Sequence, residues 1–224
     1  MQIISIHVPK AGGTSMLDLW RRTFGPQRVL ADYEDPPGDP AARHLLDPEG
    51  WQEARPQSLD PEWRVVHGHF RPHKYDRLEN VFRLTLLRHP LQNMLSIYFY
   101  WKTIPPQPSA LHRYFLEQRL DLLGLARLPL LRHLYSRTYF GDWDMGRLDF
   151  IGSHEDRPAT LRRLEQALGL RLDQDTRLNV TPPEPFEQER ARLLDDQRLM
   201  ARLQDLLRDD IRFYETHLQR PPRS

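Results

Sequence analysis

The first candidate site is a pair of glycines that a lysine precedes and two hydroxyl residues follow. The segment is Pro9-Lys10-Ala11-Gly12-Gly13-Thr14-Ser15. Glycines let the backbone curl so that successive N–H groups point at one anion, and a helix starting here adds the positive end of its dipole. The Lys10 ammonium and the two hydroxyls add further donors. The pattern predicts a phosphate-binding loop, although a Walker A loop has its lysine after the glycines. The alternative is an ordinary Gly-Gly turn beside a surface lysine.

A second candidate anion site is an arginine at the end of an apolar run. Arg88 follows Val81–Leu87, His89-Pro90 then starts a helical pattern, and Ser96 lies about two turns further on. A guanidinium is a planar fork of donors that suits a phosphate, and Ser96 reaches the same anion if its helix face is turned inward. Taken alone, a surface arginine and a solvent-facing serine are the simpler explanation. Together with the glycine loop about 70 residues upstream, the pair favours a second phosphate subsite.

The third candidate is His67-Gly68-His69, at the expected end of another strand. Two imidazoles without a nearby acid or cysteine pattern make a poor metal site. A histidine does titrate near neutrality and can take a proton from a hydroxyl. We therefore expect a general base here and an acid limb near neutrality in the pH–rate profile. A pair of structural histidines is the alternative. Apart from these two and the nearby His73, the other seven histidines, which include His7 and His154, form no convincing constellation.

Strands that alternate with helices must position these three segments. Apolar runs predict strands at 3–8, 63–66, 81–87 and 148–151. Periodic patterns predict helices after the glycine loop, from Pro90, within 109–135, over 158–168 and, as one long helix, over 187–217. Residues 26–62 are expected to form an irregular excursion with at most short helices. The alternation predicts an α/β class, a three-layer P-loop-like fold with a central mostly parallel sheet flanked by helices. Ligands bind at the carboxyl ends of such strands, where all three candidates lie.

Length and composition narrow the class of protein. The length of 224 residues suits one large domain. The composition, with 39% hydrophobic and 28% charged residues, indicates a folded globular chain. A net charge of +1 argues against a nucleic-acid wrapper. The absence of cysteine excludes disulfides, thiolate catalysis and zinc–thiolate or iron–sulfur sites. We expect a cytoplasmic protein with no membrane span and no signal peptide, and the oligomeric state stays open.

The motifs also resemble those of a known family. Ile6 to Ser15 resembles the 5′-phosphosulfate loop of sulfotransferases that use 3′-phosphoadenosine 5′-phosphosulfate (PAPS). It is most similar to the carbohydrate branch, which includes the heparan and uronyl 2-O-sulfotransferases. Arg83 to Pro90 with Leu95 to Tyr98 is similar to the family's 3′-phosphate motif, with His89 where aspartate is more usual. Similarity covers nearly the whole chain and is weak in 26–62 and 103–147, although Glu155, Asp210 and Tyr214 also resemble family landmarks.

The resemblance implies one sulfotransferase domain over residues 1–224, in which 26–62 and 103–147 set acceptor specificity. The implied reaction moves a sulfuryl group from PAPS to a hydroxyl of an acceptor, a sugar or glycoconjugate, and leaves adenosine 3′,5′-bisphosphate. No metal is implied. The His-Gly-His triplet resembles that of the 2-O-sulfotransferases, which implies that His69 is the base and His67 a substrate or orienting contact. Lys10 is implied as a catalytic group, and the implied donor-binding residues are Lys10, Ala11, Gly12, Gly13, Thr14, Ser15, Arg88 and Ser96.

Two other classes of function stay open. A P-loop nucleoside or small-molecule kinase is disfavoured because the lysine precedes the glycines and no clear strand-end aspartate is available for magnesium. A non-catalytic module that binds a nucleotide or glycan would keep binding but form no product.

Overall fold

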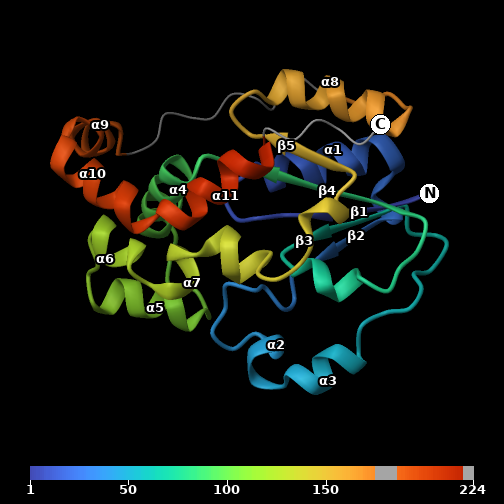
Figure 1. The fold of residues 1–224 in the computed structure, drawn as a ribbon, viewed down its shortest axis with the longest axis horizontal. Helices are drawn as coiled ribbons and strands as arrows, with labels where there is room; N and C mark the ends of the chain where they lie inside the picture. The colour runs from blue at the N-terminus through green and yellow to red at the C-terminus, as the bar shows by residue number, and fades with distance from the viewer. Residues whose placement is uncertain (175–185, 219–224) are drawn as a thin grey trace.

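A five-stranded sheet forms the centre of the structure (Figure 1). The computed structural model describes residues 1–174 and 186–218. The strand order is β2-β3-β1-β4-β5, and every neighbouring pair is parallel. The strands are β1 (Gln2–Ile6), β2 (Val29–Asp32), β3 (Val65–Gly68), β4 (Val81–Leu87) and β5 (Phe150–Ser153). Helices flank this sheet, so the predicted α/β class with a parallel central sheet is confirmed.

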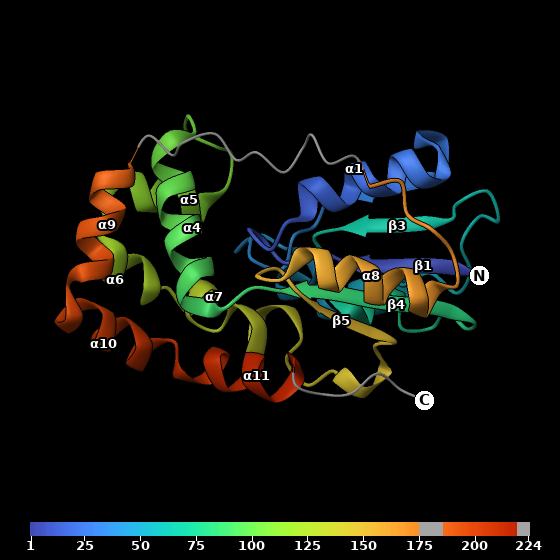
Figure 2. The same ribbon diagram turned by 90° about the horizontal axis from the view of Figure 1, so that it is seen from above.

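The two faces of the sheet are buried by different helices because successive side chains of a strand point to opposite sides. On one face, Ile3 belongs to an apolar cluster with Trp20 of α1 (Gly13–Phe24) and Leu164 of α8 (Arg157–Leu168). On the other face, Ile4 and Ile6 belong to a larger core that continues into the helices beyond the strand ends. Figure 2 shows the strands pointing toward that second group of helices.

The helices beyond the strand ends are built from two parts of the chain. After β4 come α4 (Pro90–Thr103), α5 (Ala110–Glu117), α6 (Leu122–Ala126), α7 (Pro129–Arg132), the π-helix η3 (Leu134–Tyr139) and the 3₁₀ turn η4 (Met145–Arg147). The C-terminal part gives α9 (Glu187–Asp195), α10 (Gln197–Leu206) and α11 (Arg208–Leu218). No helix among the described residues is long and apolar enough to cross a membrane.

The prediction of one helix over 187–217 is wrong, because the chain leaves helical geometry twice. Asp196 has φ −76° and ψ 92°, and its side chain accepts a hydrogen bond from the Leu199 N–H, which starts α10 anew. A second break lies at Leu207. Apolar spacing does not reveal such breaks, since the periodicity continues across them.

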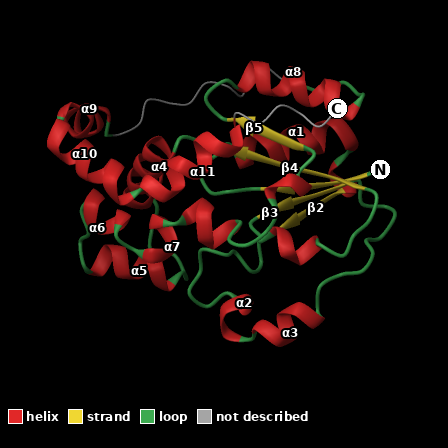
Figure 3. Ribbon diagram, in the orientation of Figure 1, coloured by secondary structure: helices red, strands yellow, loops and turns green. Residues whose placement is uncertain are grey.

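The excursion at 26–62 is less irregular than predicted. It contains η1 (Pro26–Arg28), β2, and the short helices α2 (Arg43–Leu46) and α3 (Pro48–Glu53), which lie apart from the sheet (Figure 3). β2 is an edge strand that pairs with β3 from Val29–Val65 to Asp32–Gly68. The buried Asp32 carboxylate accepts hydrogen bonds from Lys74 Nζ (2.6 Å) and Tyr75 Oη (2.8 Å) in η2 (Pro72–Tyr75). This contact fastens the excursion to the segment that follows β3.

Candidate functional site

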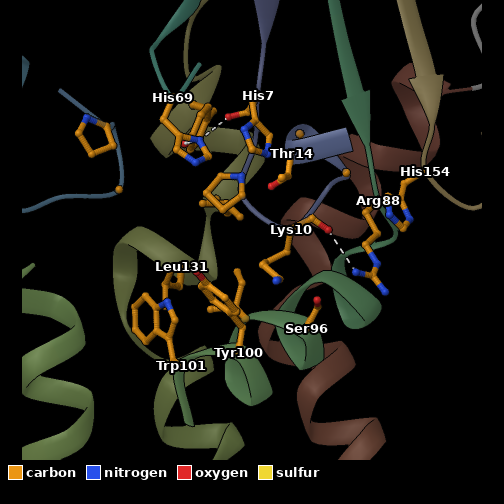
Figure 4. A pocket seen from close by; sticks show the side chains of 18 of the residues that line it. His7, Lys10, Thr14, His69, Arg88, Ser96, Tyr100, Trp101, Leu131 and His154 are labelled. Carbon is orange, nitrogen blue, oxygen red and sulfur yellow. Dashed lines mark hydrogen bonds between the residues drawn. The ribbon is translucent and has the colours of Figure 1, made fainter. Parts of the chain in front are cut away.

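A cavity of about 580 Å³ lies at the carboxyl ends of the strands (Figure 4). Eight of the ten residues proposed from the sequence line it, and Ala11 and His67 do not. The eight are Lys10, Gly12, Gly13, Thr14, Ser15, His69, Arg88 and Ser96. Both excursions also reach the cavity, with Pro36, Gly38 and Asp39 from the first and Ser109, Leu131, Leu134 and Tyr139 from the second.

The loop after β1 presents a row of backbone donors. Gly12 adopts φ 85°, and α1 begins at Gly13 without a side-chain cap. In the described part of the chain, the N–H groups of residues 12–15 have no hydrogen-bond acceptor, and the Met16 N–H is the first that bonds back, to the Gly12 carbonyl. Free N–H groups at a helix start are suited to an anion. Ala11 differs because its side chain is buried and its N–H donates to the Val8 carbonyl.

Glycine is needed at position 13 for a steric reason. A Cβ at this position would lie 1.8 Å from the His7 ring. Gly13 therefore lets the loop pass close to His7, which carries no recognisable motif in the sequence.

Side chains from neighbouring segments fasten the loop through its carbonyl groups. Asn93 Nδ2 donates to the Pro9 carbonyl (2.8 Å), and Arg88 Nη1 donates to the Lys10 carbonyl (3.1 Å). His67 Nε2 donates to the Gly13 carbonyl (3.1 Å). The other ring nitrogen of His67 lies 2.8 Å from Ser5 Oγ, and the side chain is 1% exposed. Both ring nitrogens are thus engaged inside the protein, and the buried His67 side chain does not line the cavity.

Lys10 is held over an aromatic ring at the floor of the cavity. Its backbone has φ 61°, in the left-handed region that residues with a Cβ seldom adopt. Its Nζ lies 3.8 Å from the centroid of the Tyr100 ring, a distance typical of a cation–π contact. Figure 4 shows the Lys10 side chain pointing into the cavity, toward Tyr100.

Arg88 and Ser96 both line the cavity, on the same side of Lys10 (Figure 4). Tyr135 of η3 fixes the Arg88 backbone, because its hydroxyl donates to the Arg88 carbonyl (2.8 Å) and lies 3.3 Å from the Arg88 N–H. Ser96 is 7% exposed on the face of α4 that lines the cavity. His154, at the end of β5, joins them although no sequence pattern marked it. Burial, with the Arg88 guanidinium next in importance, lowers the pKa of His154 to about 4.

His69 lies toward the opposite end and has a defined tautomer. Its Nδ1 lies 2.7 Å from the His7 carbonyl and 3.0 Å from Tyr139 Oη. A carbonyl oxygen only accepts, so Nδ1 carries the proton and Nε2 keeps its lone pair. No hydrogen bond to Nε2 is found within residues 1–174 and 186–218. Burial lowers the pKa of His69 to about 4, partly offset by the His7 carbonyl. The imidazole is therefore neutral well below pH 7, and the expected acid limb near neutrality needs correction.

His7 is the main residue that the sequence did not mark. Its ring stacks on His69 at 4.3 Å and on His67 at 5.2 Å between centroids, and its Nδ1 lies 3.2 Å from Tyr33 Oη. Burial lowers the pKa of His7 well below its usual value, and His69 adds to this effect. The pairing of Ser5 with His67 in the parallel sheet brings these rings together, and that register was not known from the sequence.

The cavity thus has two chemically different ends. In Figure 4, His69 and His7 lie on one side of Lys10, and Arg88, Ser96 and His154 lie on the other. The second side offers the Arg88 guanidinium and the Ser96 hydroxyl to an anion, and the first offers a neutral imidazole to a proton donor.

Comparisons with known proteins give structural likenesses but no match of sequence. No protein-family model matches the chain, and no curated protein matches its sequence. Among solved structures, the chain is similar to a crystal structure of a sulfotransferase from Alicyclobacillus acidocaldarius. The sequence identity is 16%, the TM-score is 0.43, and the match covers 96% of this chain and 99% of the other.

Proposed function

We propose that the chain is a PAPS-dependent sulfotransferase that transfers a sulfuryl group to a hydroxyl of an acceptor. The observation that carries this proposal is one cavity that combines a loop of unpaired N–H groups, an arginine–serine pair and a neutral histidine. The sequence resemblance described above points to the same reaction.

The residues present fit the donor. PAPS, when bound, supplies an activated sulfuryl group on a nucleotide that also carries a 3′-phosphate. The N–H groups of residues 12–15 and the Lys10 ammonium suit the 5′ end, because they offer donors and positive charge without a competing carboxylate in the loop. Arg88 and Ser96 suit the 3′-phosphate, which separates PAPS from ATP.

Different residues of this chain have different roles in the proposed reaction. His69 Nε2 takes the proton of the acceptor hydroxyl, since its lone pair is fixed by the Nδ1–H contact with the His7 carbonyl. Lys10 and the loop N–H groups hold positive charge where negative charge grows during transfer. His67 acts as a positioning residue through the Gly13 carbonyl.

The acceptor is proposed to be a sugar or glycoconjugate, on the strength of the resemblance to the carbohydrate branch. The two excursions supply the acceptor wall in this proposal, since Pro36, Asp39, Ser109 and Leu131 line the cavity. We also propose that residues 1–224 act as one domain, because the donor loop and both excursions share this single cavity.

Nucleotide-dependent thermal stability tests the donor assignment. Adenosine 3′,5′-bisphosphate at about 100 times its dissociation constant should add about 2.7 kcal/mol to the free energy of unfolding and raise the melting temperature. Adenosine alone is the control and should have little effect. A rise with Mg-ATP but not with the bisphosphate would favour the kinase instead. Labelled PAPS with polysaccharide, glycolipid and phenol acceptors then tests turnover, and binding without product from any acceptor would favour a non-catalytic module.

A further inference from the structure

Arg157 is a cationic side chain that the roles above do not use. It is the first residue of α8, three residues after His154, and is partly buried. A Cβ on Gly12 would lie 3.0 Å from Arg157 Nη1 and 3.0 Å from His154 Cδ2. The guanidinium and the imidazole therefore both pack against the donor loop, at a position where glycine leaves room for them.

The surroundings of Arg157 do not neutralise its charge. Among the described residues, no carboxylate forms an ion pair with it. The adjacent carboxylates are engaged elsewhere: Asp156 accepts from the Ala159 N–H (3.1 Å), and Glu155 accepts from the His89 N–H (2.6 Å) and Ser153 Oγ (2.7 Å).

Arg157 lies behind Gly12, next to the residues that line the cavity, and other guanidinium groups act on it and on His154. Burial and then the Arg22 guanidinium lower the pKa of Arg157, and Arg88 and Arg157 both contribute to the low pKa of His154. Partly burying a guanidinium that has no carboxylate partner is unfavourable unless an anion joins it.

We propose that Arg157 is a further donor-binding residue, whose guanidinium contacts a phosphate group of the donor nucleotide at the Gly12 side of the cavity. The proposal rests on the proposed function and adds a residue to its donor site. A nucleoside bisphosphate carries two phosphate groups, each with a charge of about −1.5 to −2 near neutral pH. Lys10 and Arg88 supply one positive charge each, so a third cation beside the loop brings the site closer to the charge of its ligand.

Titration calorimetry of Arg157→Gln with adenosine 3′,5′-bisphosphate tests this assignment. We expect affinity to fall about tenfold to hundredfold, as for loss of a charge-assisted contact. Arg157→Lys should recover part of the loss. Arg162→Gln is the matched control, because Arg162 lies exposed on the same helix, and it should bind as the unchanged protein does. Adenosine 3′-monophosphate and 5′-monophosphate, tested in parallel, identify the phosphate group by which of the two loses affinity.

The outcomes separate this inference from the proposed function. If the unchanged protein and Arg88→Ala behave as proposed while Arg157→Gln binds the bisphosphate as tightly as the unchanged protein, Arg157 alone is wrongly assigned. If Arg157→Gln loses affinity for unphosphorylated adenosine to the same extent, the defect is structural and the assignment is overturned. If the unchanged protein does not bind the bisphosphate, the proposed function fails and this assignment fails with it.

Discussion

Lowering the pH tests the assignment of His69 more sharply than deleting the residue. The structure places the proton of the neutral ring on Nδ1 and lowers the pKa of His69 from 6.5 to about 4, mainly through burial. A histidine with the ordinary pKa of 6.5 would become protonated on mild acidification and could no longer act as a base. His69 should remain neutral, and therefore active, under the same conditions.

The size of the effect follows from the two pKa values. At pH 5, a histidine with a pKa of 6.5 keeps about 3% of its neutral form, whereas one with a pKa of about 4 keeps roughly 90%. Turnover at pH 5 should therefore remain close to its value at pH 7, whereas a base with a pKa of 6.5 would lose about 25-fold. Below pH 4 it should fall about tenfold for each pH unit.

The assay has two independent readouts. Transfer from labelled PAPS to an accepted hydroxyl compound is followed from pH 8 to the lowest pH at which near-ultraviolet circular dichroism still shows the folded protein. Carbon-13 chemical shifts of the histidine rings, with His69 assigned by comparison with His69→Gln, give the pKa without any acceptor. His69→Ala should lower turnover about 10²–10⁴-fold and leave affinity for the bisphosphate unchanged.

Two results would refute the reasoning. If turnover declines near pH 6.5 and His69 titrates at the same pH, burial does not lower the pKa of His69. Turnover of His69→Ala within tenfold of the unchanged protein would show that the base lies elsewhere.

Three further predictions concern the donor loop and the buried histidines. Lys10→Ala should lower turnover about 10²-fold or more, because it removes a charge beside the transferring group, and near-normal turnover of the purified variant would contradict that role. Arg88→Ala should weaken binding of the bisphosphate by about 1.5–3 kcal/mol. Adenosine 5′-monophosphate should lose less, since only the contact with the Lys10 carbonyl is then removed, and calorimetry showing equal losses would argue against a 3′-phosphate site. The free energy of unfolding should fall as the pH drops from 6.5 toward 4, because His7, His67 and His69 are neutral in the folded protein but take up protons when unfolded. Each contributes up to about 1.4 kcal/mol per pH unit, so an unchanged urea midpoint between pH 7 and pH 5 would rule this out.

The parts of the fold that the sequence predicted are those set by local pattern. β4 and the start of α4 fall where Val81–Leu87 and Pro90 place them, and the break after β1 falls at the glycine loop. β2 was missed because four residues between proline-rich stretches carry too little periodicity to identify a strand. Its status as a strand comes from pairing with β3, which is a long-range contact.

Some residues of the candidate site could likewise be predicted from local sequence patterns, and others could not. Lys10, Gly12, Arg88 and the His-Gly-His triplet were found because glycine, arginine and histidine at strand ends have local signatures. Spacing was unable to distinguish His67 from His69, since both nitrogens of His67 are occupied by residues from distant segments. His154 and Arg157 could not be predicted from a local pattern. They lie against Gly12 because β5 pairs with β4 in the sheet, which is a long-range contact.

The hydrogen bonds to the carbonyls of the loop after β1 also fix the direction in which the loop's N–H groups point. In a trans peptide the carbonyl of one residue and the N–H of the next point in opposite directions. Because His67 draws the Gly13 carbonyl toward the sheet, the Thr14 N–H must face away from the sheet. A flip of this plane, which would turn an oxygen toward an incoming anion, first requires breaking a buried hydrogen bond. The loop therefore keeps its donor polarity before any ligand arrives, and little ordering of the backbone remains to oppose binding.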